Sequence, residues 1–187
     1  MARSLSTIKE KELSPAINSM VISPRTTTIL ASYNCTAACK HCCFDCRPRI
    51  NTRMTLDKIL RFIKEASRFK TMKLIVFSGG ECFLLGKELD TAIKFATDLG
   101  LSTRCVTNGY WATTEERAAQ RLQKVIDAGL KEINFSTGDF HQEFVPQSNI
   151  VNGALASVRL GLSTVIMIEL QKERKVTAPK IRSDPLF

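Results

Sequence analysis

The sequence predicts an α/β fold of about five parallel βα units with one open edge. Short apolar runs alternate along the chain with longer segments in which apolar residues recur at helical spacing. Glycine, asparagine or serine flanks each short run, as is typical of strands that end in loops. Strands that alternate with helices in this way form a parallel sheet whose connections are the helices.

Five apolar runs are expected to be strands. They lie at Thr27–Ser32, Lys73–Phe77, Leu101–Val106, Glu132–Phe135 and Thr164–Ile168. A last strand without a neighbour leaves backbone donors and acceptors unpaired at a sheet edge. We therefore expect either that another chain or domain covers this edge, or that the chain is a fragment.

Four helices are expected in the connections. The first begins after Thr55, and its apolar residues Leu56, Ile59 and Ile63 share one face. The others are a helix over Lys87–Leu99, a helix that starts with a capping box of Thr113 and Glu116 and stops at Gly129, and a helix over Ser148–Leu160.

The composition is that of a globular domain. The chain has 187 residues, of which 44% are hydrophobic, and it carries 27 Lys and Arg against 18 Asp and Glu. These values exclude a disordered polymer, a collagen and a coiled coil. No apolar run approaches the roughly 18 residues of a membrane span, and charges interrupt the N-terminus before a secretory signal can form. We expect a cytoplasmic protein, with import into an organelle left open.

We expect three regions along the chain: an N-terminal leader over residues 1–25, a core over 26–170, and a basic tail or truncated helix over 171–187. Residues 1–70 carry 13 Lys and Arg against five Asp and Glu, whereas the rest of the chain carries 14 against 13. This excess either attracts an anionic partner, such as nucleic acid or an acidic peptide, or reflects a basic tail and a solvated helix face.

Seven cysteines in a chain without a signal peptide favour metal or redox chemistry over disulfides. Five of them fall within twelve residues, namely Cys35, Cys39, Cys42, Cys43 and Cys46. Neighbours this close do not easily meet the Cβ separations and torsions of relaxed disulfides. The frame Cys35-x3-Cys39-x2-Cys42 can instead supply three thiolates to an iron–sulfur cluster, and three ligands on a four-iron cube leave one iron without a protein ligand.

The segment Asn34-Cys35-Thr-Ala-Ala-Cys39-Lys-His41-Cys42, directly after the first expected strand, resembles the radical S-adenosylmethionine (radical SAM) superfamily. The resemblance implies a partial (β/α)6 TIM-like barrel. It also implies a [4Fe-4S] cluster on Cys35, Cys39 and Cys42, with the amino and carboxylate groups of S-adenosylmethionine on the fourth iron. His41 takes the position of an aromatic residue that packs beside the cofactor.

Ser78-Gly79-Gly80-Glu81, after the second expected strand, resembles the second motif of the family. The resemblance implies that Gly80 and Glu81 hold the methionine amino group, with Gly79 beside them in the cofactor site. Cys82 stands where the family usually has proline. Every candidate residue follows a strand, and functional residues of parallel βα barrels lie at the C-terminal ends of strands.

Later candidates each have two interpretations. Asn108 contacts the cofactor or only forms the turn that Asn-Gly favours. Ser136, Asp139 and His141 either lie where the family contacts ribose or substrate, or form a turn with an exposed histidine. In the functional interpretation Asp139 and His141 are catalytic, with His141 as a proton donor or acceptor because its reference pKa lies near neutrality. Glu169 is a ribose or substrate ligand, or a solvated residue at the rim.

The remaining cysteines lie outside the three-cysteine frame. Cys43 and Cys46 ligate a second centre, relay or shield the first, or are incidental thiols. Cys105, inside the third strand, is expected to be a small buried hydrophobic residue. The role of Cys82 stays open.

The resemblance implies an enzyme that reductively cleaves S-adenosylmethionine to methionine and a 5′-deoxyadenosyl radical, which abstracts hydrogen from an unidentified substrate. An external electron donor is the implied partner, the substrate is a peptide or a small molecule, and no membrane takes part. The protein contributes geometry and a cavity that excludes water.

Other function classes remain open at this point. The cysteines also fit a non-catalytic iron–sulfur module, or a zinc module in which Cys39/Cys42 and Cys43/Cys46 act as pairs. An inactive, truncated radical SAM remnant is a third alternative, and it would bind a cluster but release no 5′-deoxyadenosine.

Overall fold

The chain folds into one parallel sheet whose connections are helices. The structure is a computed structural model that describes residues 23–187, so most of the expected leader over residues 1–25 lies outside the described residues. The strands pair in the order in which they occur along the chain: β1 (Thr26–Leu30), β2 (Leu74–Ser78), β3 (Ser102–Thr107), β4 (Glu132–Thr137) and β5 (Ser163–Ile168). All neighbouring pairs are parallel, which confirms the predicted fold class.

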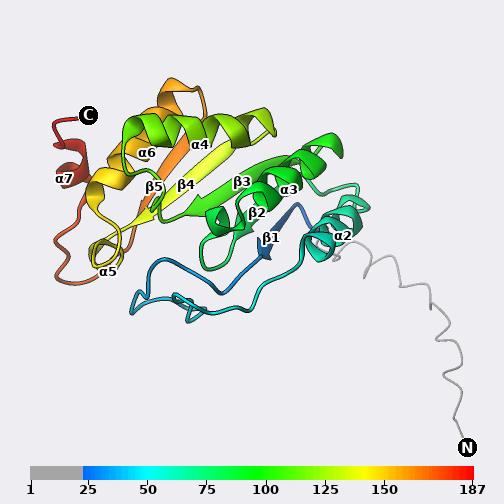
Figure 1. Ribbon diagram of the computed structural model, residues 1–187, viewed down its shortest axis with the longest axis horizontal. Coiled ribbons are helices and arrows are strands. Elements are labelled where there is room, and N and C mark those ends of the chain that lie inside the picture. The colour runs from blue at the N-terminus through cyan, green and yellow to red at the C-terminus, as the bar shows by residue number, and fades with distance from the viewer. Residues whose placement is uncertain (1–22) are drawn as a thin grey trace, which may run out of the picture.

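Four long helices make the connections and pack along one face of the sheet (Figure 1). They are α2 (Leu56–Ser67), α3 (Lys87–Asp98), α4 (Glu115–Asp127) and α6 (Gln147–Arg159). The core lies between these helices and the sheet, where Phe77 and Phe135 of the strands are buried with Leu89 and Leu122 of the helices. Burial of this apolar surface is the main favourable contribution to folding.

The sequence does not predict two short helices, η1 (Cys82–Leu85) and α5 (Asp139–Gln142), which follow β2 and β4. Each has four residues, about one turn, and so leaves no periodic pattern in the sequence. Both lie directly after strand ends and shape the loops there. A further short helix, α7 (Ala178–Arg182), lies within the region that was expected to be a tail or truncated helix.

The helix starts are partly as predicted. Thr55 caps α2, and its side chain accepts a hydrogen bond from the backbone N–H of Lys58. The expected capping box of Thr113 with Glu116 is wrong by one residue. Thr114, in an extended conformation, caps α4, and its side chain accepts a hydrogen bond from the backbone N–H of Arg117. A capping box also needs a glutamate or glutamine at this third helical position, whose side chain accepts from the backbone N–H of the cap residue, and arginine cannot accept such a bond.

The sheet does not close into a barrel. Within the part of the chain that the structure describes, β1 and β5 each have one neighbour. On β5 the apolar side chains of Val165 and Met167 are 41% and 38% exposed. The expected open edge is therefore present in the described residues. No helix among them is long and apolar enough to cross a membrane.

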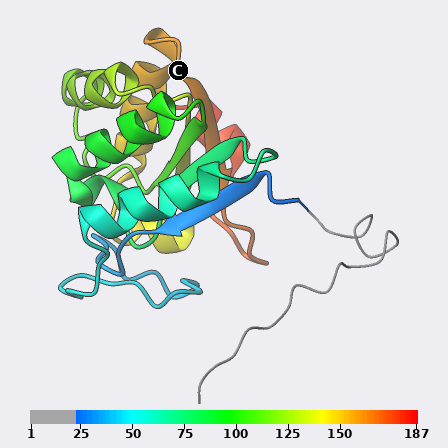
Figure 2. The same cartoon turned by 90° about the vertical axis from the view of Figure 1, so that its right-hand side faces the viewer.

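Because the strands are parallel, the loops that follow them meet at one end of the sheet. The longest of these loops joins β1 to α2 and carries five of the seven cysteines. Figure 2 shows this loop extending beyond the end of β1. The loops after β2, β3 and β4 lie beside it, and together the four loops build the site.

Candidate active site

A cavity of about 250 Å³ lies at the C-terminal ends of the strands. It is lined by residues of the β1 loop and by residues that follow β2, β3 and β4. Nine of the predicted cluster-ligand, cofactor and catalytic residues line it: Cys35, Cys39, His41, Cys42, Gly79, Gly80, Asn108, Ser136 and His141. The structure therefore brings together candidates that are up to about a hundred residues apart in the chain.

The three thiols of the predicted frame face this cavity, and N–H groups point at two of the sulfurs. Cys35 Sγ accepts from the backbone N–H of Ala37 at 3.4 Å and from Nδ2 of Asn108 at 3.6 Å. Cys42 Sγ accepts from the backbone N–H of Cys46 at 3.4 Å. Such donors stabilise negative charge on sulfur, as thiolate ligands of a metal centre require.

Burial raises the pKa of the Cys35 thiol, and it raises the pKa of Cys39 to about 12. In the absence of a metal centre these thiols are therefore protonated near neutral pH. A thiophilic centre displaces those protons when it binds, because thiolates are the ligand form. Three thiols on one cavity, two of them with N–H donors at their sulfurs, fit an iron–sulfur cluster.

Gly79 and Gly80 bring the β2 loop against the cysteine loop. The backbone N–H of Gly80 donates to the carbonyl of Ser32 at 2.6 Å, and that of Glu81 donates to the carbonyl of Asn34 at 2.9 Å. A Cβ atom on Gly80 would lie 2.1 Å from the Asn34 carbonyl oxygen. Only glycine permits this approach, so the motif positions the cysteine loop through its backbone.

The Glu81 side chain lies behind the cavity wall. It is 1% exposed, and its Oε1 accepts from the Phe83 backbone N–H at 3.0 Å and from the Thr107 hydroxyl at 2.8 Å. Its Oε2 accepts from the Asn108 backbone N–H at 2.8 Å. Burial raises the pKa of this carboxyl to about 7, although the three hydrogen bonds oppose the shift. The carboxylate that the sequence assigns to the cofactor is thus engaged within the protein.

Asn108 is more than a turn residue. Its Nδ2 donates to the Thr36 hydroxyl at 2.9 Å as well as to Cys35 Sγ, so the β3 loop is tied to the cysteine loop. From the other side, Nδ2 of Asn149 in α6 donates to the carbonyls of Gly109 and Tyr110. These contacts hold the loop after β3 against the cavity.

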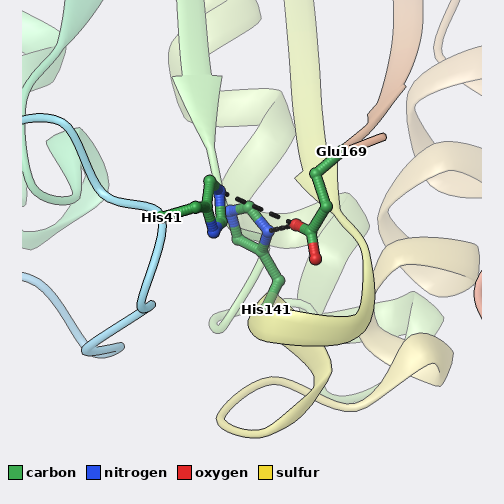
Figure 3. A group of neighbouring side chains, drawn as sticks. All are labelled: His41, His141 and Glu169. Carbon is green, nitrogen blue, oxygen red and sulfur yellow. Dashed lines mark hydrogen bonds and ion pairs between the residues drawn. The ribbon is translucent and has the colours of Figure 1, made fainter. Parts of the chain in front are cut away.

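A polar group is formed by His41, His141 and Glu169 (Figure 3). The two histidines line the same cavity as the thiols. His141 Nδ1 lies 2.6 Å from Oε2 of Glu169, and His41 Nε2 lies 3.7 Å from the same oxygen. Oε1 of Glu169 accepts from the Phe140 backbone N–H at 2.6 Å. The His41 ring stacks on Phe140, with ring centroids 5.2 Å apart. The three residues come from the cysteine loop, from α5 and from the end of β5.

Burial lowers the pKa of His141, and the adjacent Glu169 only partly offsets this effect. The imidazole is therefore neutral near pH 7, and its Nδ1–H donates a hydrogen bond to the Glu169 carboxylate. Nε2 is then unprotonated and able to accept a proton. The three ligand atoms of His41, His141 and Glu169 lie within 4.8 Å of one another, so this group also has the composition to hold a divalent cation.

Asp139 does not line the cavity. Its carboxylate accepts from the side chain of Gln171 and from the backbone N–H groups of Lys175 and Val176, each at 2.7 to 2.8 Å. These bonds lower its pKa and fix the segment after β5. The structure thus places this predicted catalytic residue in a loop-anchoring position, whereas Ser136 and His141 of the same segment reach the cavity.

The other cysteines differ in position. Cys46 lines the cavity and is buried, which raises its pKa to about 12, and Cys43 is exposed at the rim. Cys105 is buried in β3, as predicted. The thiol of Cys82 is buried as well and donates to the Val106 carbonyl at 3.3 Å.

Sequence reasoning missed two residues that shape the site. Thr107 ends β3, and its hydroxyl donates a hydrogen bond to the Glu81 carboxylate. The same hydroxyl accepts a hydrogen bond from Nε1 of Trp111 at 3.1 Å. The indole also stacks on Phe83 of η1, with centroids 4.5 Å apart. A threonine at a strand end and a tryptophan in a loop give no signal by themselves. The only available clue is their place next to Asn108 in the segment Thr-Asn-Gly-Tyr-Trp.

The chain is similar in sequence to proteins of one known family. The family model described as "Radical SAM superfamily" matches residues 29–158. A protein of Bacillus subtilis (strain 168) named "Putative peptide biosynthesis protein YydG" is 28% identical over 128 residues. That match covers 68% of this chain and 40% of the relative, so the chain spans less than half the length of the relative.

Solved structures share the fold at low sequence identity. Native anSMEcpe with bound AdoMet and Kp18Cys peptide has a TM-score of 0.56 at 15% identity, over 76% of this chain and 43% of that one. BtrN in complex with AdoMet and 2-DOIA has a TM-score of 0.54 at 17% identity, over 78% of this chain and 56% of that one.

Proposed function

The chain belongs to the radical SAM superfamily, and on that premise we propose that it binds a [4Fe-4S] cluster and S-adenosylmethionine to start radical chemistry on a peptide substrate. The observation that carries the proposal is one cavity lined both by the thiols of Cys35, Cys39 and Cys42 and by the Gly79-Gly80 backbone. The thiols are the predicted cluster ligands, and the glycines belong to the predicted cofactor site.

The chain's own residues have distinct tasks in this proposal. Cys35, Cys39 and Cys42 would hold the cluster, which would supply the electron for reductive cleavage of S-adenosylmethionine and so for hydrogen abstraction from the substrate. Gly79 and Gly80 line the same cavity and present backbone groups to the cofactor. Such a cavity protects the reaction from water and solvent reductants.

The remaining polar residues serve the cofactor and the substrate. His41, stacked on Phe140, packs against the cofactor from the cysteine loop. Ser136 and Glu169 are candidate contacts for ribose or substrate. His141 accepts a proton at Nε2 and later donates it, because Nδ1 keeps its own proton in the hydrogen bond to Glu169. An external electron donor reduces the cluster.

A peptide is the favoured substrate class. The relative YydG is named as a peptide biosynthesis protein, and anSMEcpe is seen with a bound peptide. BtrN, seen with 2-DOIA, represents the small-molecule alternative.

The test is anaerobic reconstitution with iron and sulfide, followed by reduction in the presence of S-adenosylmethionine. We expect 5′-deoxyadenosine to form with the native chain and with Cys43→Ala, which removes an exposed thiol outside the frame. We expect none with Cys39→Ala. Zinc without acid-labile sulfide, or equal product from Cys39→Ala and the native chain, would overturn the proposal.

A further inference from the structure

We propose that Glu81 and Asn108 are positioning residues that aim one N–H group at the sulfur of Cys35 and thereby raise the reduction potential of the cluster. This inference rests on the proposed function, because it concerns the cluster that Cys35 would bind. It assigns Glu81 a task within the protein in place of a contact with the cofactor.

The hydroxyl of Thr107 has only one possible direction for its proton. Its oxygen accepts from the Gly109 backbone N–H at 3.1 Å and from Trp111 Nε1 at 3.1 Å. A hydroxyl has two acceptor lone pairs and one proton. Both lone pairs are used, so the proton goes to Glu81 Oε1 at 2.8 Å.

Glu81 is the common acceptor that joins two loops. Its Oε1 accepts hydrogen bonds from the Thr107 hydroxyl and the Phe83 backbone N–H. Its Oε2 accepts one from the Asn108 backbone N–H. The carboxylate is 1% exposed, so water cannot replace it. Its removal would leave three buried donors without their acceptor, which is unfavourable. The carboxylate therefore fixes the backbone of Asn108 relative to the β2 loop.

The Asn108 side chain is fixed from both ends. Its Oδ1 accepts from the Tyr110 backbone N–H at 3.1 Å, which determines which end of the amide is nitrogen. The two protons of Nδ2 then go to the Thr36 hydroxyl at 2.9 Å and to Cys35 Sγ at 3.6 Å. All polar atoms of this amide have partners, so the N–H direction toward sulfur is set by the network.

An N–H group that points at a ligand sulfur favours the more negative state of the cluster. Reduction adds one negative charge, which is shared by the cluster and its thiolates, and the hydrogen bond strengthens as that charge grows. Removing the donor therefore lowers the reduction potential. Hydrogen bonds from outside the ligand set are a recognised way to tune such centres.

The experiment is a redox titration of the reconstituted chain, followed by the electron paramagnetic resonance signal of the reduced cluster. Asn108→Leu keeps the approximate volume and removes the donor. We expect its ratio of reduced to oxidised cluster, at a fixed applied potential, to fall about threefold to tenfold; tenfold corresponds to about 59 mV for one electron. Iron and sulfide content should stay at the native level.

Thr107→Val provides a second variant that does not touch the ligand loop. It removes the hydroxyl that donates to Glu81, and we expect the midpoint potential to fall, by less than in Asn108→Leu. Thr107→Ser keeps a hydroxyl at this position, so its midpoint potential should be that of the native chain. The matched control is Thr103→Val, a buried threonine on the same strand whose hydroxyl donates to the Gly129 carbonyl at 3.3 Å. Its midpoint potential should equal that of the native chain.

The outcomes separate this inference from the proposed function. A native midpoint potential in both Asn108→Leu and Thr107→Val, with a cluster present, would overturn the positioning role and leave the cluster assignment intact. A shift in Thr103→Val as large as in Thr107→Val would also overturn it, because the effect would then report general loosening of β3. A native chain that assembles no cluster would overturn the proposed function and this inference together.

Discussion

Nδ1 of His141 lies 2.6 Å from Oε2 of Glu169, although the two residues are 28 positions apart and belong to different elements. The contact is possible because β4 and β5 pair in parallel and end side by side, with Thr137 opposite Ile168. Gly138 makes room for it, since a Cβ atom there would lie 2.1 Å from the Glu169 carboxyl carbon. The pair therefore depends on strand register and on one glycine.

His141→Asn should separate cofactor cleavage from substrate chemistry. The variant loses the base at Nε2, so we expect product formation from the substrate to fall about 10²- to 10⁴-fold. Formation of 5′-deoxyadenosine without substrate should stay close to the native rate, because that step depends on the cysteine loop. Single-turnover product analysis by mass spectrometry measures both quantities. An equal loss of both would instead assign His141 to cofactor binding.

Gly80→Ala should abolish cluster binding. The added methyl group would overlap the backbone carbonyl of Asn34, so the cysteine loop has to move. We expect loss of the iron chromophore and a destabilisation of several kcal/mol. Gly161→Ala is the control: it has a φ of +73° and open space around it, so it should cost only about 1 kcal/mol of backbone strain. Retention of native iron content in Gly80→Ala would contradict the close approach of the two loops.

Because of Glu81, the free energy of unfolding of the cluster-free chain should decrease as the pH rises. Burial raises its pKa to about 7 in the folded chain, above the value of 4.5 for an unperturbed group. Its contribution to the free energy of unfolding is therefore fully present below about pH 4.5 and is lost as the pH rises to about 7, on the order of 3 kcal/mol in total.

Denaturant unfolding of the native chain and of Glu81→Gln across this pH range measures the effect. Glutamine cannot ionise, so the difference between the two chains should change between about pH 4.5 and pH 7 and stay constant above it. A difference that is independent of pH would show that the Glu81 carboxyl is not desolvated.

Cys46→Ala should retain the cluster. The contact of residue 46 with Cys42 Sγ comes from its backbone N–H, which alanine keeps. We expect native iron and sulfide content and native 5′-deoxyadenosine formation. Loss of iron in this variant would show that Cys46 is a ligand, as one of the interpretations of the sequence allows.

The sequence predicted the features that depend on spacing and strand order. The three thiols, the two glycines, Asn108, Ser136 and His141 all reach one cavity, because each follows a parallel strand and such strands end together. Apolar periodicity likewise placed the strands and the four long helices, with boundaries within a few residues.

Features that depend on the partner of a side chain could not be predicted. Asp139 and His141 stand two residues apart, yet one anchors the segment after β5 and the other faces the cavity, because α5 turns their side chains in different directions. Glu81 lies in the expected motif, but its burial is decided by Thr107 and Asn108 on the next strand. Spacing along the chain carries no information on such contacts.

The proposed function requires that the thiols of Cys35, Cys39 and Cys42 share one cluster. Iron and acid-labile sulfide analysis of the anaerobically reconstituted chain measures this. We expect about four of each per chain, in the native protein and in Cys43→Ala, and near-complete loss in Cys39→Ala. Zinc without sulfide in the native chain, or an unchanged iron content in Cys39→Ala, would contradict it.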